Sequence, residues 1–129
     1  MKTTEAKVTD AELAVLKALW EQGGSTIREL TDKLYPGGGT SQYATVQKLL
    51  ERLESKSCVA RESSSRAHRF RALVAVDELI DQTLRETAAR LCEGSLTPLL
   101  THLVQSRTLK QAELQELRRL VDKLDEGQN

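Results

Sequence analysis

Apolar residues recur at helical spacing in three consecutive segments of the first half of the chain. The first segment begins with "TDAE", in which Thr9 and Glu12 have the spacing of a capping box, and it ends at Gly23–Gly24. The second begins with "TIRE", where Thr26 and Glu29 repeat that spacing, and it ends at "PGGG". Two capped helices are therefore predicted before residue 40.

The third segment, "TSQYATVQKLLERLESKS" at residues 40–57, predicts an amphipathic helix with Ser41 as its N-cap. With successive residues about 100° apart around the helix axis, one face carries an apolar stripe. This stripe consists of Val46, Leu49, Leu50 and Leu53. The opposite face is small and polar and consists of Ser41, Ala44, Thr45, Gln47, Lys48, Glu51 and Arg52, with Tyr43 on its flank.

A strand-like pattern follows the third helix. "CVARE" at 58–62 and "HRFRALV" at 68–74 flank "SSSRA", which has turn composition, and together they predict a β-hairpin with a basic tip. Helical spacing returns at residue 76 and is interrupted by "EGS" at 93–95, where Ser95 can cap the next helix. A last helix is predicted from about Lys110 to Leu124, with leucines at heptad-like spacing.

The order of these elements is three helices, a hairpin and three further helices. It predicts a mainly α protein with a winged helix-turn-helix DNA-binding domain at residues 1–75 and a helical dimerisation domain at residues 76–129. The second part has more leucine than so short a segment can bury by itself, so we expect a second copy to cover it. The expected dimerisation residues are Leu79, Leu84, Leu91, Leu99, Leu103, Leu114, Leu117, Val121 and Leu124.

Charge is distributed unevenly although the formal net charge is zero. Residues 1–75 hold 12 basic and 9 acidic residues, whereas residues 76–129 hold 7 and 10. Residues 41–71 alone hold 7 basic and 3 acidic residues. Because salt screens exposed charges beyond roughly 8–10 Å, this local excess governs the attraction to a phosphate backbone.

The composition narrows the class of protein. Hydrophobic residues make up 39% of the chain and aromatic residues 3%, which suits a helical protein with an aliphatic core. No stretch approaches the roughly 20 apolar residues that span a bilayer, and no secretory signal is present, so we expect a cytoplasmic protein without membrane insertion. The two cysteines are expected to be reduced. No catalytic motif or paired metal ligands occur, so no enzyme activity, cofactor or metal site is expected.

The outward face of the third helix has chemistry that suits a DNA groove. Ala44 and the methyl group of Thr45 can contact a thymine methyl group, Gln47 can pair with adenine, and Lys48 can reach guanine or a phosphate. A solvated helix face is the alternative explanation, and the pattern of this helix alone leaves both open. The capped helix before it and the basic hairpin after it favour DNA binding.

Longer motifs connect these elements: "ELAVLKALWEQGGSTIRELTDKL", "YATVQKLLERLESK" and "RAHRFRALV", followed by a tail with "LCEGSLTPLLTHLV" and "AELQELRRLVDKL". Over about residues 8–125 the chain resembles the BlaI/MecI/CopY penicillinase-repressor family. The resemblance implies a homodimeric winged-helix repressor that binds a two-fold-symmetric operator of resistance or stress genes. Ser57 stands where the family usually has glycine after the third helix.

The resemblance also implies roles for individual residues. The third helix would supply the base contacts, from Tyr43, Ala44, Thr45, Gln47 and Lys48, with Ser41 at its start. Contacts to the DNA backbone would come from Arg52 and from the hairpin residues Arg66, His68 and Arg69. Thr26, at the start of the second helix, is assigned to the same interface.

In antibiotic-responsive members of the family, a membrane sensor-protease starts proteolysis inside the dimerisation part. The matching place is Thr101, His102, Leu103 and Val104, although "THLV" lacks the asparagine–aromatic pair of the best-known members. The clustered C-terminal cysteines of copper-responsive members are absent from "VDKLDEGQN". An inducing signal is thus expected, with proteolysis as one route. The alternative function is a winged-helix protein-interaction module without DNA binding, against which the basic hairpin argues.

Overall fold

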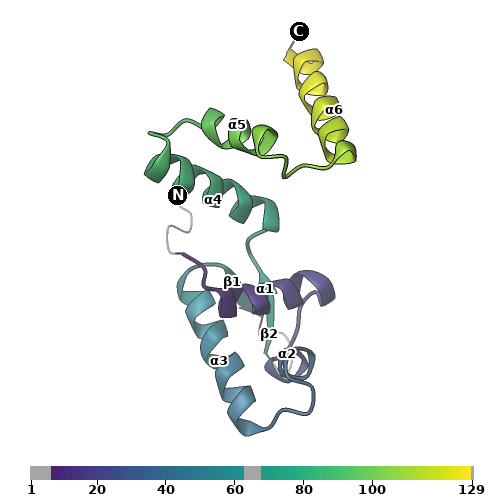
Figure 1. The fold of residues 1–129 in the computed structure, drawn as a ribbon. Helices are drawn as coiled ribbons and strands as arrows, with labels where there is room; N and C mark the ends of the chain where they lie inside the picture. The colour runs from purple at the N-terminus through teal and green to yellow at the C-terminus, as the bar shows by residue number, and fades with distance from the viewer. Residues whose placement is uncertain (1–6, 63–67, 129) are drawn as a thin grey trace. The chain divides into compact units, whose positions relative to one another are not determined.

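The computed structural model describes residues 7–62 and 68–128 and is mainly helical, as the sequence predicts (Figure 1). The chain divides into two compact units, residues 1–79 and 80–129. A functional boundary after residue 75 stays a prediction. The elements in chain order are α1 (Asp10–Gln22), α2 (Ile27–Leu34), α3 (Thr40–Ser55), β1 (Val59–Glu62), β2 (Arg69–Ala72), α4 (Val76–Leu91), α5 (Thr97–Gln105) and α6 (Gln111–Gln128).

Both predicted capping boxes are present. At α1, the amide of Glu12 donates to Thr9 Oγ1 at 3.2 Å, and the Thr9 amide donates to Glu12 Oε1 at 2.9 Å. At α2, Thr26 and Glu29 exchange the same two hydrogen bonds, at 2.9 and 3.1 Å. Each box satisfies two backbone donors that a helix start would otherwise leave without partners, so the sequence fixes where both helices begin.

The start of α3 differs from the prediction, because the N-cap is Gly39 and not Ser41. Glycine has no side chain to cap the helix, and its amide instead donates to Gln42 Oε1 at 2.9 Å. The turn before it is tight, since the Gly38 amide donates to the Tyr35 carbonyl at 2.7 Å and Gly37 has a φ of 78°. Glycine adopts this left-handed conformation without steric cost, which explains the glycine run between α2 and α3.

The core of the first unit forms where α1, α2 and α3 meet the hairpin. The apolar stripe predicted for α3 is fully inside it, and Trp20 packs at its edge with its indole N–H donating to the Val74 carbonyl at 2.8 Å. Leu79, in the first turn of α4, also packs against this core. The buried members are Val15, Leu16, Ala18, Leu19, Leu30, Val46, Leu49, Leu50, Leu53, Cys58, Val59 and Phe70.

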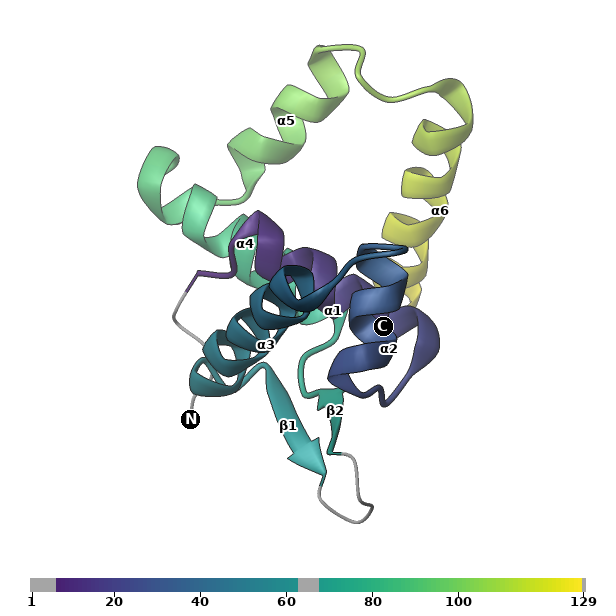
Figure 2. The same cartoon turned by 90° about the horizontal axis from the view of Figure 1, so that it is seen from below.

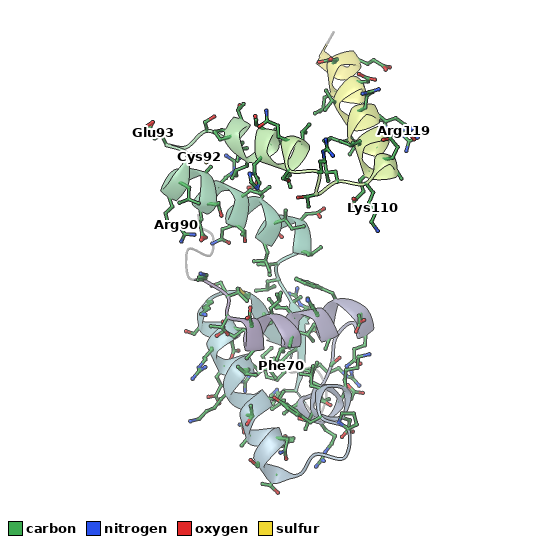
Figure 3. The ribbon with its side chains drawn as sticks, in the orientation of Figure 1. Phe70, Arg90, Cys92, Glu93, Lys110 and Arg119 are labelled. Atoms are coloured by element: carbon green, nitrogen blue, oxygen red, sulfur yellow. The ribbon has the colours of Figure 1, made fainter. Side chains whose placement is uncertain are left out.

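The hairpin is antiparallel, with Val59 opposite Ala72 and Glu62 opposite Arg69 (Figure 2). A contact that sequence patterns did not predict ties it to the helices. Ser25, between α1 and α2, forms a β-bridge with Phe70: the Ser25 amide donates to the Phe70 carbonyl at 3.0 Å, and the Phe70 amide donates back at 2.8 Å. The side chain of Phe70 lies in the interior of the unit (Figure 3), so both the backbone and the side chain of this residue hold the hairpin in place.

A buried carboxylate links the start of α1 to the end of α3. The Glu12 side chain is only 1% exposed, and Lys56 Nζ, just after α3, lies 2.5 Å from its Oε1 atom. The same ammonium group donates to the Lys7 carbonyl at 2.6 Å. Burial raises the pKa of Glu12, but hydrogen bonds from Lys56 and the Thr9 amide outweigh burial, so its pKa lies below the ordinary value of a glutamate side chain.

In the second unit the helices begin and end close to the predicted residues. The chain turns after α4 at Gly94, whose φ is 86° and whose amide donates to the Ala88 carbonyl at 2.9 Å. Ser95 Oγ accepts a hydrogen bond from the Thr97 amide at 3.3 Å, although the N-cap of α5 is Leu96. The last helix extends four residues beyond the predicted end at Leu124.

We predict that Gly38→Ala destabilises the protein. A Cβ atom at this position would lie 2.9 Å from the Tyr35 carbonyl oxygen and 3.0 Å from Tyr35 Cβ, so the turn has to distort. The expected loss is about 1–3 kcal/mol in the free energy of unfolding, measured by chemical denaturation. Gly24→Ala is the control, because its new Cβ would meet only ordinary contacts, at 3.6 and 3.9 Å. Equal losses in the two variants would contradict the steric argument.

We also predict a pH-dependent contribution of Glu12. Because its pKa is lowered in the folded protein, its stabilising effect is complete above the pKa of the unfolded chain and is lost as the pH falls through the folded-state pKa. Wild type should therefore exceed Glu12→Gln by about 1–3 kcal/mol in the free energy of unfolding at pH 7. The difference should shrink as the pH is lowered from about 5 to about 3, since the unfolded carboxyl titrates near 4.3. A difference that does not change with pH would contradict the argument.

Candidate nucleic-acid interface

The predicted DNA-reading face of α3 is open to solvent in the isolated chain. Its exposed members are Ser41, Ala44, Thr45, Gln47, Lys48 and Arg52, and Tyr43 on the flank is half-buried. The Thr45 hydroxyl donates to the Ser41 carbonyl one turn earlier, at 3.1 Å. The first acidic residue of the helix is Glu51, so its N-terminal three turns carry no negative side chain. Before Glu51, which is itself exposed, the face therefore presents small, amide and cationic groups without an opposing charge.

Arg69 joins the hairpin to the start of α2. Its Nη1 atom donates to the Gly24 carbonyl at 2.9 Å and to Glu29 Oε1 at 3.1 Å. The Thr26 amide, followed by the charge of Arg69, holds the pKa of Glu29 below its usual range. Arg69 thus positions the base of the wing, in addition to the DNA-backbone contact predicted for it.

The other described arginines of the hairpin also have acidic partners. Arg61 lies over the Phe70 ring, 5.1 Å from its centroid, and its Nη2 atom is 3.2 Å from Glu54 at the end of α3. Arg71 pairs with Glu62 across the two strands at 3.6 Å. These exposed pairs are individually weak, but they offset the positive charge that the sequence places on the hairpin.

Cations without such partners lie on α3. Among the residues that the structure describes, neither Lys48 nor Arg52 forms an ion pair. His68 is exposed immediately before β2, whereas Arg66 lies outside the described residues. Thr26 is half-buried, and its hydroxyl accepts the capping bond from the Glu29 amide.

One pair in this region was not predicted from the sequence. The guanidinium carbon of Arg28, in the first turn of α2, lies 5.5 Å from the centroid of the Tyr43 ring on α3. The two residues are far apart in the sequence, and neither belongs to a motif that pairs them, so only the fold brings them together.

The expected dimerisation residues lie mostly on open surfaces of the single chain. Leu91 is 69% exposed and Leu124 65% exposed. Leu84, Leu103 and Val121 are also exposed, and Leu99, Leu114 and Leu117 are half-buried. Leu79 is the exception, since it packs against the core of the first unit.

The structure also gives the surroundings of the proposed proteolysis region and of Cys58. The suggested proteolysis region, Thr101 to Val104, is exposed in the second half of α5. Cys58 is buried, and burial raises the pKa of its thiol, which makes it a poor nucleophile at neutral pH. Within residues 7–62 and 68–128, no group of three or more potential metal ligands occurs, and no helix is long and apolar enough to cross a membrane.

A family model described as "Penicillinase repressor" matches residues 8–123. The chain belongs to the penicillinase repressor family. It is 31% identical over 127 residues to the transcriptional regulator BlaI of Mycobacterium tuberculosis H37Rv, a match that covers 95% of this chain and 90% of BlaI. It is 20% identical over 117 residues to the methicillin resistance regulatory protein MecI of Staphylococcus aureus N315, covering 91% and 94% of the two chains.

Solved structures confirm the fold class. A MarR family protein from Bacillus stearothermophilus superposes with a TM-score of 0.50 at 24% identity, covering 97% of this chain and 78% of the other. The transcriptional regulator Tm0710 from Thermotoga maritima also gives 0.50, at 18% identity, covering 92% and 74%. The winged helix-turn-helix predicted from the sequence is therefore confirmed. Membership of a repressor family also confirms that the chain is a regulator and not an enzyme.

Proposed function

We propose that this penicillinase-repressor family protein binds a two-fold-symmetric operator as a homodimer, with α3 of each protomer in the major groove. Its membership of the family makes it a DNA-binding transcriptional repressor. The observation that carries the proposed geometry is the outward face of α3, where Lys48 and Arg52 have no ion-pair partners among the described residues.

The side chains on this face suit particular contacts. Gln47 can donate to and accept from the edge of adenine, and Lys48 can donate to guanine O6 and N7. Ala44 and Thr45 are small enough to let the helix approach the bases and can contact thymine methyl groups. Arg52, two turns after Thr45, would bind a phosphate, and His68 would extend the backbone contacts from the hairpin.

Exposed apolar residues on α4, α5 and α6 support the homodimer. Leucines that are 40–69% exposed in one chain cost free energy in water, and a stable protein covers a surface of this kind with a partner. Pairing of two protomers would also give the two-fold symmetry that spaces two copies of α3 along the DNA.

Release of the operator would follow a signal that weakens the dimer. Proteolysis near Thr101–Val104, started by a membrane sensor-protease, is one such signal, and the exposure of this segment supports it. A repressor of this kind works where the DNA is, so we propose a cytoplasmic location.

We predict that Lys48→Ala and Thr45→Ala weaken operator binding without loss of folding. The probe is the duplex that wild type enriches from a random pool, which we expect to contain an inverted repeat. Each variant should lose at least about fivefold in affinity by gel shift, because each removes a groove contact. Lys17→Ala, which removes an exposed cation from α1, is the control and should bind as wild type does. Unchanged affinity in both α3 variants would overturn the assignment of α3, and no enrichment of any duplex would favour a protein-interaction module.

We further predict that Leu124→Glu disrupts the homodimer. The side chain is 65% exposed in the single chain, and a buried, unpaired carboxylate at a dimer interface would be costly. Wild type should sediment with twice the 14.4 kDa mass of the chain, and the variant should shift toward the monomer. Gln115→Glu, which adds the same charge about 140° away from the leucine seam of α6, should remain dimeric. A wild-type monomer at micromolar concentration would refute the homodimer.

A further inference from the structure

Arg28 and Tyr43 connect the two helices of the helix-turn-helix. Arg28 is exposed in the first turn of α2, and its guanidinium carbon lies 5.5 Å from the centroid of the Tyr43 ring, on the flank of the reading face of α3. A cation within about 6 Å of a ring centroid is attracted by the negative face of the ring. The pair therefore holds a positive charge beside the N-terminal turns of α3.

The guanidinium group of Arg28 keeps its charge and its donors. Among the residues that the structure describes, none forms an ion pair with it, in contrast to Arg61, Arg69 and Arg71 of the hairpin. A guanidinium that stacks on a ring uses its face and leaves the N–H groups in its plane free. Those groups have the planar fork that binds phosphate oxygens.

The other polar groups at the start of α2 already have hydrogen-bond partners. The Glu29 carboxylate accepts hydrogen bonds from the Thr26 amide and from Arg69. The Thr26 hydroxyl accepts a hydrogen bond from the Glu29 amide. The carboxylate at this helix end would also repel a phosphate placed directly on it. A side chain that reaches beyond the cap is therefore better suited to bind an anion than Thr26 is.

We infer that Arg28 binds a backbone phosphate of the operator next to the groove that α3 occupies, and that Tyr43 is the ring on which Arg28 is positioned. The sequence indicated only Thr26 at the start of α2 for this interface, and the inference adds Arg28 to it. It also changes the role of Tyr43 from a base contact to a positioning residue. The inference rests on the proposed function, since it needs α3 to lie in the groove.

The first experiment compares two cations of the same helix. Arg28→Ala should weaken binding of the enriched duplex roughly tenfold per protomer at low salt. The slope of log affinity against log salt should also decrease by about 0.9 per protomer, because one phosphate is no longer neutralised. Lys33→Ala is the matched control, since Lys33 is exposed on α2 and already pairs with Glu21 at 3.4 Å, and it should leave the slope unchanged.

A second experiment identifies the phosphate. Each phosphate of the duplex is replaced in turn by a neutral methylphosphonate. Wild type and Lys33→Ala should lose affinity at one symmetry-related pair of positions at which Arg28→Ala loses none. If Arg28→Ala responds to every substitution as wild type does, Arg28 contacts no phosphate and the inference is wrong.

Substitutions of Tyr43, alone and together with Arg28→Ala, test its role. Tyr43→Phe keeps the ring and should bind as wild type does. Tyr43→Leu should weaken binding about twofold to fivefold, the worth of an exposed cation–π contact, and should have no further effect in the Arg28→Ala background. An additional loss in that background would show a direct base contact by Tyr43 and would overturn its positioning role.

These outcomes separate the two proposals. If wild type enriches no duplex, the proposed function and this inference both fail. If wild type binds and Lys48→Ala weakens binding, but Arg28→Ala matches Lys33→Ala in affinity and salt slope, only the inference fails. Thermal unfolding followed by circular dichroism checks that each variant is folded, which the exposure of Arg28 leads us to expect.

Discussion

Burial of one face of α3 is the constraint on which the rest of the first unit depends. Val46, Leu50 and Leu53 are fully buried, and Leu49 nearly so, against α1 and α2. Each contributes about 1.5–3 kcal/mol by leaving water, so the four together approach the whole net stability of an ordinary domain. Rotation of α3 by one residue would expose part of that stripe. The inward leucines therefore determine which side chains face outward, and the proposed DNA-reading surface is a consequence of the core.

The hairpin is positioned by the same core through one residue. Phe70 inserts its ring among the helices while its amide and carbonyl pair with Ser25. Arg69, next to it, holds the Gly24 carbonyl and the carboxylate that caps α2. These contacts fix where the described part of the hairpin lies relative to the start of α2. The short glycine turn after α2 then leads directly into α3.

Local signals in the sequence predicted most of the elements, and non-local contacts account for what was missed. The boxes at Thr9 and Thr26 need only residues three positions apart, so the starts of α1 and α2 were predicted correctly. Ser41 was wrong as a cap because the Gly39 amide donates to Gln42 Oε1, so a glycine without a capping side chain stands at the N-cap position. The Ser25–Phe70 bridge and the Arg28–Tyr43 pair depend on how distant segments meet, which hydrophobic periodicity does not encode. The predicted dimerisation residues were chosen from leucine stripes, but only the fold separates Leu79, which packs against the core of the first unit, from those that are exposed or half-buried.

Charge shows most clearly what the fold adds to the sequence. Residues 41–71 have an excess of basic residues, and much of that excess lies on the hairpin. In the folded unit Arg61, Arg69 and Arg71 each face a carboxylate, so their contribution to a phosphate-attracting field is partly cancelled at short range. Lys48 and Arg52 have no ion-pair partner among the described residues, and they lie on a helix whose orientation the core fixes. In the proposed complex, these unpaired cations lie on the same surface as the side chains proposed to read the bases. The phosphate contacts would then be strongest in the orientation in which sequence can be distinguished.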